Sequence, residues 1–84
     1  MTSTATATAA DLLLAIADYI DRPGGWVTAD GVLHRADIAR EAHAVGLDSR
    51  GFVEIFTDWS GHPYMVRPTH RGWLAASRLQ RRRA

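Results

Sequence analysis

Residues 42–59 read AHAVGLDSRGFVEIFTDW, and the conformation of this stretch decides the fold of the 84-residue chain. Four large apolar residues recur at i, i+3, i+4 and i+7, the stripe of an amphipathic helix: Phe52, Ile55, Phe56 and Trp59. Asp48 or Ser49 can cap this helix, because a short side-chain oxygen accepts from the free amides of the first turn. Since capping and stripe agree, we predict a helix over residues 48–59, with Trp59 in the core or at its edge.

The same stretch also carries the pattern of a β-hairpin. Val53, Ile55 and Thr57 alternate as in a half-buried strand, and a Ser-Gly pair precedes a second extended stretch, HPYMVR, at residues 62–67. Gly51 costs about 1 kcal/mol inside a helix, and less near its start. A hairpin over residues 53–67 is therefore the alternative to the helix.

A first helix is predicted over residues 11–21, DLLLAIADYID, where apolar residues recur at helical spacing. Thr8 or Asp11 can cap its start, and RPGG at residues 22–25 stops it. The Thr- and Ala-rich residues 1–10 are expected to form a flexible tail.

A second helix is predicted over residues 35–45, RADIAREAHAV, which are rich in good helix formers and end before Gly46. The connector between the two helices, residues 26–33, is expected to carry a short strand or a small hairpin that turns at Asp30-Gly31.

A last helix is predicted from Thr69, a suitable N-cap, with Trp73, Leu74 and Leu79 as its apolar stripe. We expect it to fray after Gln80 and to leave residues 81–84 as a basic tail.

Five residues stand at the offsets of a helix-turn-helix: Ala42, Gly46, Leu47, Phe52 and Ile55. A small Ala42 lets a second helix cross closely, Gly46 permits the positive φ of the turn, and the other three are apolar contacts between helices. A strand followed by Thr69-x-x-Gly72 completes the pattern. On these motifs, residues 11–80 resemble the winged helix-turn-helix family of small transcription regulators.

The resemblance implies a fold that is mainly α with a small β component, with three to four helices plus short strands in one winged-helix-like domain over residues 11–80. It also implies a small DNA-binding transcriptional regulator. Residues after Asp48 would enter the major groove of double-stranded DNA, and Arg67, Arg71 and the terminal arginines would hold phosphates. The candidate DNA-binding residues are Arg35, Ser49, Arg50, Thr57, His62, Arg67 and Arg71. The resemblance permits a homodimer formed through residues 11–21 or the last helix.

The charge distribution is consistent with a polyanionic partner. The chain has a net charge of +1, but residues 1–58 hold all nine acidic residues with four arginines, whereas residues 59–84 hold six arginines and no acid. Such asymmetry points to contact with a polyanion. The alternative is that the two halves neutralise each other and that the basic tail keeps the protein soluble. Every basic residue is arginine, so phosphate contacts can be bidentate.

Composition argues against several other classes. There is no cysteine, which excludes disulfides and fits a reducing cytoplasm, where we expect the chain. The four histidines lack the tight spacing of metal ligands, so we expect neither a metal nor a cofactor. We expect no contact with membranes, because no apolar run approaches about 20 residues. We also expect no enzyme activity, because a chain this short offers little cleft and has no Gly-rich phosphate loop.

A second hypothesis is a winged-helix-like protein-interaction module, acting as an adaptor or inhibitor in a larger assembly without binding DNA. The acidic side chains of residues 11–21, together with Glu54 and Asp58, would then dock a basic protein partner. The negative charge at Glu54 and Asp58 favours this hypothesis, because it opposes entry of residues 48–59 into a DNA groove.

Overall fold

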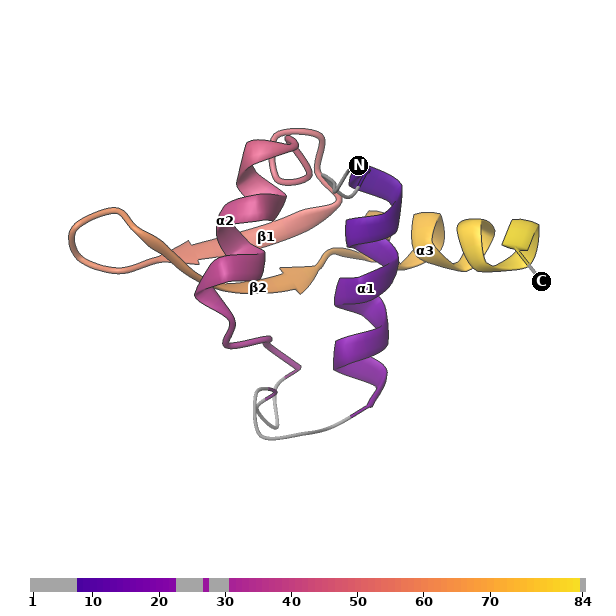
Figure 1. The fold of residues 1–84 in the computed structure, drawn as a ribbon, viewed down its shortest axis with the longest axis horizontal. Helices are drawn as coiled ribbons and strands as arrows, with labels where there is room; N and C mark the ends of the chain where they lie inside the picture. The colour runs from indigo at the N-terminus through magenta and orange to yellow at the C-terminus, as the bar shows by residue number, and fades with distance from the viewer. Residues whose placement is uncertain (1–7, 23–26, 28–30, 84) are drawn as a thin grey trace, which may run out of the picture.

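The computed structural model describes residues 8–22, 27 and 31–83. This part of the chain forms three helices and a two-stranded antiparallel sheet, in the order α1 (Ala9–Asp21), α2 (Ala36–Ala44), β1 (Val53–Thr57), β2 (Pro63–Pro68) and α3 (His70–Arg83). The loop between β1 and β2 projects at one end of the molecule and α3 extends at the other (Figure 1). The predicted mainly helical fold with a small β component is confirmed.

The first helix forms as predicted, and Thr8 rather than Asp11 caps it. The Thr8 hydroxyl accepts a hydrogen bond from the Asp11 amide at 3.1 Å. The apolar face buries Leu12, Leu13, Ile16 and Ala17. The expected stop at residues 23–25, most of the expected N-terminal tail and the expected turn at Asp30 lie outside the described residues.

The second helix also forms as predicted, and Gly46 ends it. Gly46 has φ +77°, a conformation that a residue without Cβ adopts easily. The chain then turns back so that the Leu47 amide donates to the Ala42 carbonyl at 3.0 Å. Ala42 and Leu47 are both buried, so this tight turn closes over the core.

The predicted helix over residues 48–59 is wrong, and the hairpin forms instead. A single turn follows Gly46, in which the Gly51 amide donates to the Asp48 carbonyl at 3.1 Å. Gly51 then adopts φ +82°, outside the helical region, and the Phe52 amide returns to the Leu47 carbonyl at 2.9 Å. The chain continues as a strand because Val53 and the residues after it pair with β2.

The register of the hairpin places Glu54 opposite Arg67 and Ile55 opposite Val66, with an irregularity between Phe56 and Thr57. The buried Val66 also exchanges two backbone hydrogen bonds with Leu33, at 2.9 and 3.0 Å. Leu33 pairs in addition with Val27. Of the connector, the described residues Val27 and Leu33 form isolated bridges rather than a strand, and Leu33 joins the connector to the edge of the sheet.

The third helix starts at the predicted cap. The Thr69 hydroxyl accepts from the Gly72 amide at 3.1 Å and donates to the Gly51 carbonyl at 2.6 Å. α3 continues to Arg83, so it includes most of the expected basic tail.

The core gathers residues from every element: Leu12, Leu13, Ile16, Ala17, Leu33, Ile38, Ala39, Ala42, Leu47, Val53, Val66 and Ala76. Phe52 and Ile55, the other apolar residues of the helix-turn-helix pattern, pack against it although they do not lie on a helix. Within the described ranges, no helix has the length and apolar character needed to cross a bilayer.

Candidate nucleic-acid interface

Arg35 is bound within the chain. Its Nε and Nη2 donate to the two carboxylate oxygens of Asp37 at 3.0 and 2.8 Å, and its guanidinium lies 5.6 Å from the centroid of the Tyr19 ring. The hydrogen bond from Arg35 lowers the pKa of Asp37 below its ordinary value of 3.8, so the pair is ionised at neutral pH. A bidentate pair of this kind leaves Arg35 poorly suited to hold a phosphate.

Ser49 and Arg50 complete the end of α2. The last carbonyls of a helix have no partner within it. Arg50 Nη2 donates to the Val45 carbonyl at 2.6 Å and Nε to the Gly46 carbonyl at 3.2 Å, while the Ser49 hydroxyl also donates to Gly46, at 3.1 Å. Both side chains are exposed, but these contacts direct them to the backbone of Val45 and Gly46, in the turn directly after α2.

Arg67 and Arg71 differ in what they contact. Arg67 is paired across the sheet with Glu54, its Nη2 2.7 Å from the carboxylate, and it lies over the Phe56 ring. Arg71 lies 5.0 Å from the centroid of the Phe52 ring and forms no ion pair in the part of the chain that the structure describes. Of these two predicted phosphate contacts, Arg71 alone retains an unmatched charge.

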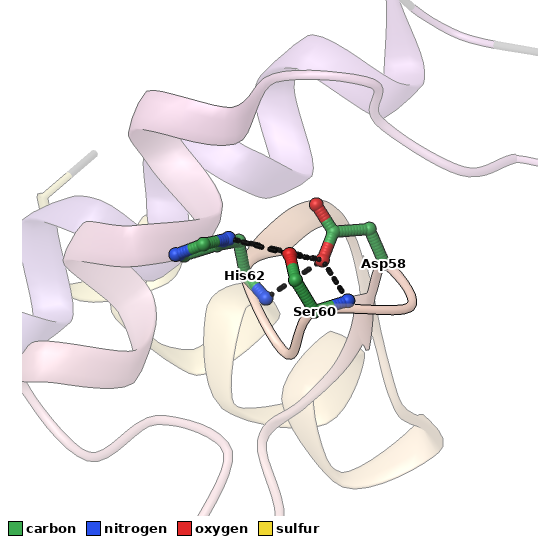
Figure 2. A network of polar contacts seen from close by, with 3 residues as sticks. All are labelled: Asp58, Ser60 and His62. Carbon is green, nitrogen blue, oxygen red and sulfur yellow. Dashed lines mark hydrogen bonds and ion pairs between the residues drawn. The ribbon is translucent and has the colours of Figure 1, made fainter.

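A polar network closes the loop between β1 and β2 (Figure 2). One carboxylate oxygen of Asp58, Oδ1, accepts from the Ser60 amide, the Ser60 hydroxyl and the His62 amide at 2.7 to 2.9 Å. The Ser60 hydroxyl also lies 2.8 Å from Nδ1 of His62. The predicted contact His62 therefore belongs to the loop network, and Thr57 ends β1 beside it as an exposed residue.

Trp59 lies in this loop and is 98% exposed. The prediction of a core position for Trp59 is wrong, because it assumed the helical stripe. In the hairpin, Trp59 lies in the loop two residues after Thr57, the last paired residue of β1, and is left in the solvent.

The Asp58 carboxyl is expected to titrate below 3.8. The His62 amide, the Ser60 hydroxyl and the Ser60 amide stabilise its ionised form and lower its pKa. Since the folded-state pKa is the lower one, the stabilisation of the loop is complete above about pH 4 and is lost as pH falls through the folded-state pKa.

A carboxyl-detected NMR titration measures the pKa of Asp58. The Asp58→Asn variant keeps an oxygen acceptor without the charge. In this variant the amide chemical shifts of Ser60 and His62 should no longer change with pH in the acidic range where Asp58 titrates. A pKa of 3.8 or above in the native chain would contradict the network.

The arginines of α3 form a stripe. Arg71, Arg78 and Arg82 are spaced i, i+7 and i+11, which places them on one helix face over about 16 Å. All three are exposed, and none forms an ion pair in the described residues. The sequence hypothesis named Arg71 and the terminal arginines but missed Arg78, although the helical spacing within residues 70–83 carries that signal.

These arginines line a groove of about 620 Å³ between α3, the start of α1 and the turn after α2, which we call the α3 groove. Its apolar lining comes from Ala9, Ala10, Leu13, Leu47, Phe52, Leu74, Ala75 and Leu79, and its polar lining from Arg50, His70, Arg71, Arg78 and Arg82. No described residue that lines it carries a carboxylate. The α3 groove therefore combines apolar surface with concentrated positive charge.

Comparisons of the chain with protein-family models, curated proteins and solved structures give no match. The described residues also contain no group of three or more His, Cys, Asp or Glu side chains that could hold a metal ion.

Proposed function

We propose that this protein is a small DNA-binding transcriptional regulator that holds the phosphate backbone with the arginines of α3. The observation that carries the proposal is the stripe of Arg71, Arg78 and Arg82, exposed, without ion pairs in the described residues, and in a groove lined by no carboxylate. Over the about 16 Å of this stripe, one DNA strand presents about five phosphates, so the three guanidiniums can each find one.

We propose a winged-helix-like arrangement in which the hairpin β1–β2 is the wing. The recognition helix of that arrangement is reduced here to the single turn that contains Ser49 and Arg50, and both side chains contact the backbone just after α2, at Val45 and Gly46. Direct reading of bases by residues after Asp48 is therefore a smaller contribution than the resemblance implied. Phosphate contacts position a protein on DNA without reading its sequence, so we expect weak sequence preference from one copy of the chain.

The protein-interaction module is the second candidate, and its proposed acidic surface is less favourable. Glu54 is paired with Arg67 and Asp18 with Arg22, so a positive charge lies beside each of these two carboxylates. Asp58 keeps its negative charge, because the loop donates only neutral hydrogen bonds to one of its oxygens. Arg71, Arg78 and Arg82, in contrast, have no acidic partner among the described residues.

The experiment that tests the proposal is fluorescence anisotropy with a labelled random-sequence duplex, titrated with the protein at several salt concentrations. We expect a dissociation constant in the range of roughly 1 to 100 µM at low salt. Three arginine–phosphate contacts predict that log K falls against log salt with a slope of about −2.7, since each contact contributes about −0.9. The absence of binding at 50 mM salt would overturn the proposal.

A further inference from the structure

The loop between β1 and β2 presents an aromatic side chain in an ordered frame. Trp59 is 98% exposed at the end of the hairpin that projects from the molecule (Figure 1). The loop around it is held by three hydrogen bonds to Asp58 Oδ1 (Figure 2). Burying this indole against another surface costs little ordering of the backbone, because the loop is already fixed. Tryptophan is also one of the residue types enriched among the dominant contacts of protein interfaces.

The carboxylate beside this indole has one oxygen without a contact. Every hydrogen bond to the Asp58 carboxylate within the described residues goes to Oδ1, and Oδ2 accepts none (Figure 2). Asp58 and Trp59 together therefore present an apolar ring and a negatively charged acceptor side by side. We call this pair of residues the knob.

The α3 groove has the complementary chemistry. Phe52 provides apolar surface, and the exposed Leu74 extends that surface to the solvent. Arg78 and Arg82 line the same groove with no carboxylate beside them. A guanidinium can stack on an indole and donate to a carboxylate oxygen, so these arginines suit both halves of the knob.

The knob does not reach the groove of its own chain. The hairpin loop and α3 extend at opposite ends of the molecule, whose longest dimension is 39 Å (Figure 1). Two copies placed side by side in opposite directions bring the knob of each to the groove of the other. Such an arrangement has twofold symmetry and closes as a dimer, because it uses both knobs and both grooves.

We propose that two copies of this chain dimerise by inserting Asp58 and Trp59 of each into the α3 groove of the other. A consequence follows that rests on the proposed function: the knob covers Arg71, Arg78 and Arg82, so the dimer does not bind DNA through them. Dimerisation itself does not depend on DNA binding.

Sedimentation velocity of the full chain over a range of concentrations, without DNA, tests the proposal. We expect a monomer–dimer equilibrium whose dissociation constant rises about 30-fold or more in Trp59→Ala, as for a dominant interface residue. Leu74→Glu, which places a negative charge in the groove, should have a similar effect. Both residues are exposed, so thermal unfolding followed by circular dichroism should confirm that the variants remain folded. Tyr19→Ala, at the far end of α1 from the groove, is the matched aromatic control and should dimerise normally.

Mixing the two variants separates the knob from the groove. Trp59→Ala lacks the knob but keeps the groove, and Leu74→Glu keeps the knob but lacks the groove, so the mixture can form one of the two contacts. We expect each variant alone to be monomeric and the mixture to form a heterodimer. A native chain that stays monomeric to about 1 mM, a dimer unaffected by Trp59→Ala, or a mixture that stays monomeric would each overturn the proposal. Failure of DNA binding would leave these sedimentation results unchanged, so the two proposals fail separately.

Discussion

Gly72→Ala is expected to lower the free energy of unfolding by about 3 kcal/mol, a large part of the 5 kcal/mol or somewhat more expected for a chain of about this size. A Cβ at position 72 would lie 1.9 Å from the carbonyl oxygen of Phe52, so α3 has to move away from the hairpin. That carbonyl is itself held by the Thr69 amide at 3.0 Å and cannot yield easily. The loss outweighs the gain of about 1 kcal/mol that alanine brings to a helix.

Urea denaturation followed by circular dichroism at 222 nm measures this change. Ser77→Ala is the control, because Ser77 is exposed on the same helix and its replacement should change stability by no more than about 0.5 kcal/mol. A Gly72→Ala protein as stable as the native chain would show that α3 does not pack against Phe52 as closely as described.

Replacing Arg71, Arg78 and Arg82 together by glutamine is expected to raise the dissociation constant for duplex DNA at 50 mM salt by about 100-fold or more. The slope of log K against log salt should also become less negative by about 2.7, because three phosphate contacts are lost. The salt slope distinguishes loss of phosphate contacts from partial unfolding of the variant, because unfolding lowers the amount of active protein without changing the slope.

Arg40→Gln is the matched control for these substitutions. Arg40 is an exposed helix arginine that forms no ion pair within the described ranges, but it lies on α2 and does not line the α3 groove. We expect Arg40→Gln to leave the affinity nearly unchanged, whereas Arg78→Gln alone should weaken it about tenfold. Equal effects of the two single variants would assign the binding to overall charge rather than to the α3 stripe.

Local sequence signals were sufficient for α1, α2, β2 and α3. Each of the helices combines a periodic apolar face with a start or stop signal close to it, such as Thr8 before α1, Gly46 after α2 and Thr69 before α3. Hydrogen bonds of this kind link residues three to five apart, so the sequence displays them directly. Gly72 is the glycine of the predicted Thr-x-x-Gly pattern. Glycine is needed there because α3 packs closely on the Phe52 carbonyl, and that contact comes from a distant part of the sequence.

The sequence by itself therefore determined the helices at both ends, the turn at Gly46 and the excess of arginine after residue 58. Only the tertiary structure decided the conformation of residues 48–59, because this stretch carries both the apolar stripe of a helix and the alternation of a strand. Pairing of β1 with β2 selected the strand, and it moved Trp59 from the expected core to the solvent. The tertiary structure also decided which arginines have an acidic partner. Glu54 pairs with Arg67 across the strands, thirteen positions away in sequence, whereas no described acidic residue lies against the stripe on α3. Such pairings join distant positions, and no local pattern encodes them.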